Sequence, residues 1–111
     1  MNIDFKEGVS NKGLVPKIYQ AIFEAAKVLN SKNFHLTVTS TTEEAEGRLE
    51  DSLHYEGKAF DIRTARMPET TSLKIVEELR KALLPIDRNF QVIWKSNHIH
   101  IELDDRSKIN A

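Results

Sequence analysis

Apolar residues recur along the chain at a helical spacing in two places. The first stripe covers about residues 15–30, and the second begins at Pro68 and Glu69 and stops at Pro85. Pro16 suits a first helical turn, because the N–H that proline lacks would have no partner there in any case. The pattern therefore predicts two amphipathic helices.

Other segments carry the alternation of apolar and polar residues that is typical of a half-buried strand. There are four of them, at residues 34–39, 58–64, 90–94 and 98–103. The last two are separated only by residues 95–97, which predict a hairpin turn. The order of elements predicts an α+β fold, with a mainly antiparallel four-stranded sheet and both helices on one face.

Length and composition are those of one ordinary globular domain. The chain has 111 residues, of which 40% are hydrophobic and 30% charged, and this suffices for one modest core. We expect a single domain over residues 1–111, with a polar lead-in at 1–13 and a polar tail at 105–111. We also expect a monomer.

Charge and patterning exclude some partners. The formal net charge is -1, so the composition does not indicate a basic surface that would bind nucleic acid. No apolar run is long enough to span a bilayer. Residues 1–7 lack the basic start and apolar core of a signal peptide. The expectation is therefore cytoplasmic synthesis without a transmembrane segment, and the site of action stays open, the cell wall included. Cysteine is absent, so a transition-metal site would have to use histidine and carboxylate.

Two stretches supply those ligand types, at residues 52–63 and 97–102. In the last strand His98, His100 and Glu102 share one face, because side chains alternate along a strand. Asp61 falls on the polar face of the earlier strand, and His54 can reach that face from the loop before it. Three protein ligands with an open fourth position would suit a catalytic zinc ion.

The first stretch resembles a known signature, Ser-x-His-x-x-Gly-x-Ala-x-Asp. D-alanyl-D-alanine carboxypeptidases, other peptidoglycan zinc peptidases and the hedgehog signalling domain share it, and the unbroken Ser-Leu-His-Tyr-Glu-Gly run is most similar to hedgehog. The second stretch resembles the His-x-His that closes the zinc site in hedgehog and the endopeptidases. The resemblance implies His54, Asp61 and His100 as zinc ligands.

The resemblance also implies a function. It indicates a zinc-dependent peptidase, of carboxypeptidase or endopeptidase type, acting on cell-wall peptides that contain D-amino acids. His98 would be the base beside the metal, and Glu102 is a candidate for supporting a ligand or for proton transfer. The alternative is a zinc-stabilised binding module with little or no catalysis, because hedgehog itself is a ligand for partner proteins.

Two departures from the family pattern bear on catalysis. The peptidases carry a glutamate three residues before the last histidine ligand, where this chain has Asn97, and hedgehog has one slightly upstream, where residues 94–96 are Trp-Lys-Ser. Any hydrolysis must then depend on His98 or Glu102. The peptidases also carry an arginine after the first strand, which Arg48 or Arg63 would have to replace.

Other residues near the first motif have two interpretations each. Ser52 and Tyr55 would orient the loop or the substrate, and for Tyr55 plain packing is an equal alternative. The acidic loop before the motif is similar to a hedgehog loop that helps to bind calcium. Its candidate ligands are Glu43, Glu44 and Glu46, and the alternative is a solvated acidic loop.

Overall fold

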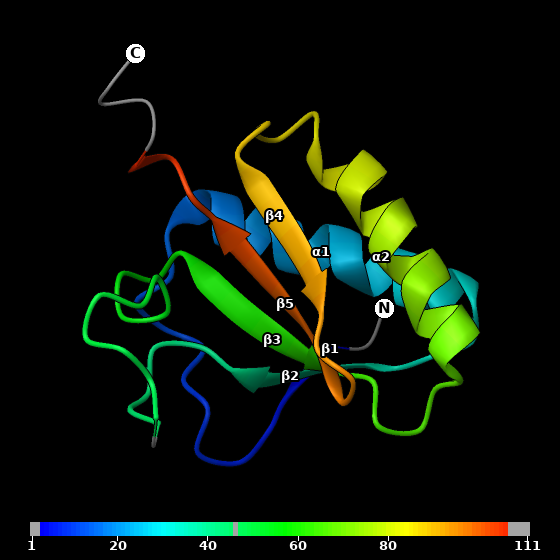
Figure 1. The fold of residues 1–111 in the computed structure, drawn as a ribbon, viewed down its shortest axis with the longest axis horizontal. Coiled ribbons are helices and arrows are strands. Elements are labelled where there is room, and N and C mark those ends of the chain that lie inside the picture. The colour runs from blue at the N-terminus through cyan, green and yellow to red at the C-terminus, as the bar shows by residue number, and fades with distance from the viewer. Residues whose placement is uncertain (1–2, 46, 107–111) are drawn as a thin grey trace.

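The computed structural model describes residues 3–45 and 47–106, which form two helices and a five-stranded sheet (Figure 1). The elements are β1 (Ile3–Phe5), α1 (Pro16–Ser31), β2 (Leu36–Ser40), β3 (Ala59–Arg63), α2 (Glu69–Leu83), β4 (Phe90–Trp94) and β5 (His98–Leu103). Across the sheet the order is β1-β2-β3-β5-β4, and every neighbouring pair except β1–β2 is antiparallel. The predicted α+β fold is confirmed, with one strand more than expected.

The additional strand, β1, lies in the segment predicted to be an extended lead-in. It runs parallel to β2, with Ile3 opposite Leu36 and Phe5 opposite Val38. Only two apolar residues fall in so short a strand, and an alternation of that length cannot be distinguished from irregular extended chain. Its partner strand is decided by tertiary packing, because Ile3 and Phe5 pack against the core. Of the predicted tail, residues 107–111 lie outside the described part of the chain.

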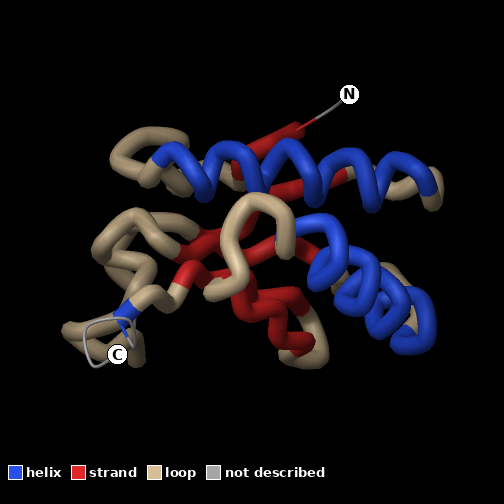
Figure 2. Tube along the Cα trace, turned by 90° about the horizontal axis from the view of Figure 1, so that it is seen from above, coloured by secondary structure: helices blue, strands red, loops and turns tan. Residues whose placement is uncertain are grey.

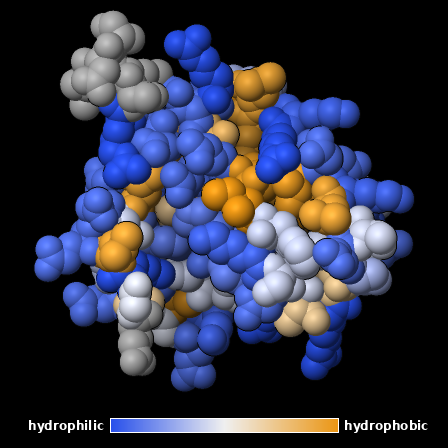
Figure 3. All heavy atoms as spheres, viewed as in Figure 1, coloured by the Kyte–Doolittle hydropathy of each residue, from blue (hydrophilic) through white to orange (hydrophobic). Residues whose placement is uncertain are grey.

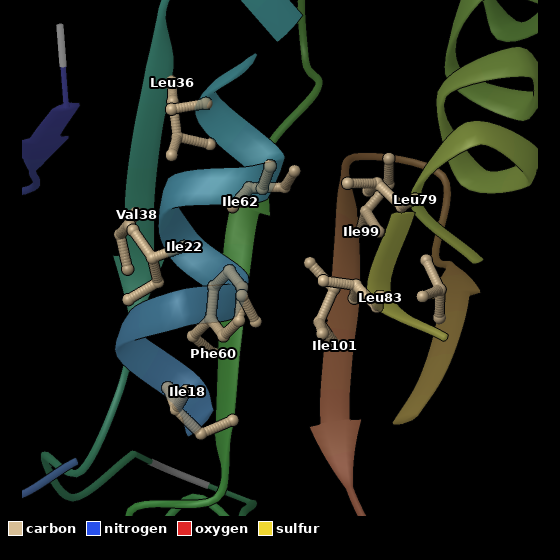
Figure 4. Close-up of a cluster of buried hydrophobic side chains, with 14 of the residues drawn as sticks. Ile18, Ile22, Leu36, Val38, Phe60, Ile62, Leu79, Leu83, Ile99 and Ile101 are labelled. Atoms are coloured by element: carbon tan, nitrogen blue, oxygen red, sulfur yellow. The ribbon is translucent and has the colours of Figure 1, made fainter. Parts of the chain in front are cut away.

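The core lies between the sheet and both helices. Ile18 and Ile22 of α1 point toward Phe60 of β3, while Leu79 and Leu83 of α2 lie over β5 (Figure 4). All five of these side chains are buried. Removing apolar surface from water contributes about 25 cal/mol per Å², so these contacts hold both helices on the same face.

The opposite face of β3 and β5 has no helix over it. Seen from above, the helices border the twisted sheet, and many of the loops gather at the left of the view (Figure 2). The β2–β3 loop, green in Figure 1, lies beside the sheet on that side. The polar residues of β3 and β5 therefore meet loops and solvent.

The outer surface is mostly hydrophilic on the side shown in Figure 3, with apolar residues gathered near the middle. Exposed large apolar side chains include Leu84 and Ile93. Within the described ranges, neither helix has the length and apolar character that crossing a membrane requires.

Candidate metal centre

The antiparallel ladder between β3 and β5 builds one half of the site. Asp61 is the direct partner of His100 in this ladder, and Arg63 is the partner of His98. Directly opposed residues point to the same face of a sheet. His100 Nδ1 consequently lies 2.8 Å from Asp61 Oδ1.

The loop before β3 supplies the other half, His54. The imidazole is buried, and its Nδ1 lies 2.8 Å from the carbonyl oxygen of Thr41. Because a carbonyl only accepts, Nδ1 carries a proton, and Nε2 faces Asp61 Oδ1 at 3.4 Å. The rings of His54 and His100 are tilted neighbours, with centroids 5.1 Å apart.

Gly57 shapes this loop. Its φ is +70°, and its carbonyl accepts a hydrogen bond from the Val15 N–H at 3.0 Å. A Cβ at this position would lie 2.1 Å from the Gly13 carbonyl oxygen. Only glycine fits both the left-handed backbone and the close approach, so the bend that returns His54 toward Asp61 depends on it.

The residues at the centre fit a zinc ion. One ligand atom each from His54, Asp61 and His100 lie within 4.8 Å of one another. Two imidazoles and one carboxylate are a donor set that zinc accepts, with a fourth position left for water or substrate. The remaining ring nitrogens also have acceptors: Thr41 O for His54, and Glu102 Oε1 at 2.7 Å for His100 Nε2. Such acceptors hold metal-binding imidazoles in the right tautomer.

The electrostatics favour positive charge at this centre. Burial alone would raise the pKa of Asp61, but hydrogen bonds from His100 and His54 outweigh it and hold that pKa well below its usual range. Burial alone would lower the pKa of His100, but Asp61 and Glu102 raise it overall. A metal ion would have to displace the proton between His100 and Asp61.

His98 lies beside this group and outside it. Its Nε2 is 3.8 Å from Asp61 Oδ2, and its Nδ1 is 2.7 Å from the side-chain oxygen of Asn97. Burial, followed by the charge of Lys95, lowers the pKa of His98, although Asp61 opposes the shift. Its predicted role as a base stays a prediction.

Arg48, predicted to hold substrate, is engaged by its own loop, and its role with substrate stays a prediction. Its guanidinium donates to the backbone carbonyl and the carboxylate of Glu43 and to Ser40 Oγ. It also lies over the Tyr55 ring, 5.3 Å from the centroid, which agrees with the packing alternative for Tyr55. Ser52 Oγ accepts from the His54 N–H at 3.2 Å, so it orients the loop.

Arg63 differs from Arg48 because its side chain is exposed, at the end of β3. A cleft of about 560 Å³ opens over the candidate metal centre, lined among others by Arg48, Ser52, Lys95 and His98. Arg63 lines a second hollow that shares Asp61 and His98 with this cleft.

The acidic loop gives Glu43 a structural role. Its carboxylate accepts from Ser40 Oγ at 2.6 Å and from the Thr41 N–H at 2.8 Å, and it pairs with Arg48. Glu44 is exposed, and Glu46 lies outside the described residues. Calcium binding by this loop stays a prediction.

Two contributors had no clear signal in the sequence. Thr41 takes part through its backbone carbonyl, which any residue carries, and its fully buried hydroxyl donates to the Ser10 carbonyl at 2.6 Å. The sequence marks Asn97 only as the position of a missing glutamate, whereas in the structure its side chain contacts His98.

Comparison with known proteins places the chain in a family. The family model of the hedgehog amino-terminal signalling domain matches residues 2–100, which include every residue of the candidate site except Glu102. No curated protein matches the chain significantly. The match covers most of the 111 residues, and the chain therefore belongs to the hedgehog amino-terminal signalling domain family.

Proposed function

We propose that this chain is a zinc-dependent peptidase-like domain acting on cell-wall peptides that contain D-amino acids, by carboxypeptidase or endopeptidase cleavage. The observation that carries the proposal is an open cleft over a His54–Asp61–His100 centre, with a fourth polar group, His98, at its edge. The substrate class rests on the likeness of residues 52–61 to the peptidoglycan zinc peptidases.

In this proposal three atoms hold the metal: His54 Nε2, Asp61 Oδ1 and His100 Nδ1. Thr41 O and Glu102 Oε1 accept the protons of the opposite ring nitrogens and so fix both tautomers. Zinc bound there supplies Lewis acidity, which lowers the pKa of water and polarises a carbonyl. Glu102 is thus assigned to supporting His100, since that contact engages its carboxylate.

His98 is assigned as the general base. Its lowered pKa keeps the imidazole neutral near pH 7, as a base must be. Asn97 Oδ1 accepts the proton of His98 Nδ1, which leaves Nε2 as a proton acceptor on the side of Asp61. His98 would take a proton from the attacking water and return it to the leaving amine.

Arg63 is assigned to a carboxylate of the substrate, because it is exposed and lies directly across the ladder from His98. Arg48, Ser52 and Tyr55 are assigned to holding the loop that carries His54. For Ser52 and Tyr55 this is the loop-holding alternative, and only for Arg48 does it differ from the expected substrate contact.

The second candidate is a zinc-stabilised binding module. It is favoured because neither carboxylate among the described residues that line the cleft is free: Asp61 faces the histidines, and Glu102 is engaged with His100. Asn97 cannot act as a base.

One experiment separates the two candidates. Zinc-loaded protein is incubated with purified peptidoglycan, and new peptide termini are sought by mass spectrometry. We expect new termini with the parent protein and none with His98→Ala, which retains the metal ligands. Stable binding to peptidoglycan without any new termini would favour the module.

A further inference from the structure

Unpaired cations gather next to the metal centre, although the chain as a whole has a net charge of -1. The side chains of Lys6, Arg63 and Arg66 form no ion pair or hydrogen bond with any described residue. All three are exposed.

These cations line two hollows that continue from the metal cleft. The first, of about 340 Å³, shares Asp61 and His98 with that cleft and adds Lys6 and Arg63. The second, of about 550 Å³, shares Arg63 with the first and adds Arg66. We call the two hollows together the basic groove. It begins at the metal centre and ends beyond β3.

Acidic groups are nearly absent from the lining. Asp61 is the only carboxylate among the described residues that line the basic groove, and in the proposed centre it is a metal ligand. Two further carboxylates contact lining residues. Asp4 Oδ2 lies 2.5 Å from Nε2 of His35, which lines the far hollow, and Glu43, which pairs with Arg48, accepts a hydrogen bond from Ser40 of the near hollow. The groove as a whole therefore presents positive charge to a ligand.

Its lining also carries groups that suit a polypeptide. The register shifts between Val38 and Ser40, so Thr39 is an extra residue in the β2–β3 ladder, and it lines the near hollow. A bulge disrupts the ladder locally, so Thr39 is outside the regular pairing with β3. Phe34 and Met67 add apolar surface in the far hollow, where a side chain can pack.

We propose that the basic groove binds an acidic peptide, with carboxylates held by Lys6, Arg63 and Arg66 and the neighbouring residues lying over the metal centre. The inference rests on the proposed function, in that it names the class of peptide that the same site takes. Binding itself requires neither hydrolysis nor His98. Guanidinium groups hold carboxylates through paired, charge-assisted hydrogen bonds, which explains the use of two arginines.

Binding of a labelled probe tests the proposal. The probe is a short fluorescent peptide of alternating L-glutamate and L-alanine, and the matched probe has glutamine at every glutamate. Fluorescence anisotropy is measured with the zinc-loaded protein at low and high salt. We expect the acidic peptide to bind and the glutamine peptide to bind at least about tenfold more weakly. High salt should weaken the binding of the acidic peptide.

Variants locate the binding. The double variant Lys6→Gln/Arg63→Gln should bind the acidic peptide at least about tenfold more weakly, and Arg66→Gln should bind it severalfold more weakly. The control is Lys81→Gln/Arg88→Gln, which removes one exposed lysine and one exposed arginine elsewhere and should leave affinity unchanged. Circular dichroism checks that each variant stays folded. These positions are exposed, so we expect unchanged melting midpoints.

The outcomes are distinct from those of the peptidoglycan assay. Equal loss of affinity in the groove and control variants, or tight binding of a sulfated polysaccharide with no binding of the acidic peptide, would overturn the acidic-peptide groove. Peptidoglycan cleavage could continue in either case. Binding of the acidic peptide through Arg63, in a protein that cleaves nothing, would support the groove and count against the peptidase.

Discussion

His100 faces Asp61 across the β5–β3 ladder, with Nδ1 of the histidine 2.8 Å from Oδ1 of the carboxylate. The two are direct partners in central strands, so their separation is set by backbone pairing and not by a flexible loop. His54 reaches them from a loop, but its own Nδ1 is fixed by Thr41. The candidate centre therefore has two ligands on rigid elements and one on an anchored loop, as a preformed site requires.

Metal content is the first prediction. The purified protein should carry one zinc per chain, because one donor atom from each of the three residues lies within 4.8 Å of the others. His54→Ala and Asp61→Ala should each remove the ion, while His35→Ala, an exposed histidine elsewhere, should keep it. Elemental analysis after dialysis measures this. Full zinc content in both ligand variants would show that the ligands are assigned wrongly.

Zinc should also stabilise the fold. A ligand that binds only the native state at a hundredfold excess over its dissociation constant adds about 2.7 kcal/mol to the free energy of unfolding. A chelator should lower the melting temperature of the parent protein and leave that of Asp61→Ala unaltered. An equal fall in both proteins would mean that the ion binds elsewhere.

The two histidines of β5 should behave differently. His100→Ala should lose zinc, whereas His98→Ala should keep zinc and lose hydrolysis, because a base beside the metal does not hold it. A general base contributes about 10²- to 10⁴-fold to the rate, so the loss should be large. Zinc content and peptide cleavage are measured on the same samples. If His98→Ala released zinc as completely as His100→Ala, His98 would be a ligand.

Glu102 offers a test of the support given to His100. Glu102→Ala removes the acceptor of His100 Nε2–H and should weaken zinc binding about 10- to 100-fold. Glu102→Gln keeps an oxygen acceptor of similar reach and should fall between the parent and the alanine variant. Competition with a chromophoric chelator gives the affinities. Equal affinity for all three proteins would remove Glu102 from the site.

Asn97→Glu tests whether the centre lacks a carboxylate base. We expect little or no gain in hydrolysis and unchanged zinc content, because His98 already occupies the position of the base. The structure adds that the side chain of Asn97 contacts the Nδ1 side of His98, away from Asp61. Rates are compared on the same peptidoglycan substrate. A tenfold rise would contradict the assignment and make the natural protein a binding module.

Much of the site could be predicted because it depends on local sequence patterns. Strand alternation and a recognisable signature were enough to bring Asp61 and His100 together, and the ladder confirms that placement. The same alternation failed for β1, where two apolar residues were too few. Nor does alternation give the partners of the Arg48 guanidinium, because these come from the folded path of the β2–β3 loop. Backbone acceptors such as Thr41 O cannot be predicted from side-chain types, because every residue carries a carbonyl.

The backbone contacts around Gly57 bear on the residence time of a bound metal ion. The Gly57 carbonyl accepts a hydrogen bond from the Val15 N–H. The Thr41 hydroxyl donates to the Ser10 carbonyl, and the Thr41 carbonyl holds the ring of His54. The segment that leads into α1 thus closes the loop that carries one of three ligands, while the other two belong to the sheet. Opening of that segment would free His54 without disturbing β3 or β5. The residence time of the metal would then follow the opening rate of the segment before α1, and the sheet could remain intact through many exchanges of the ion.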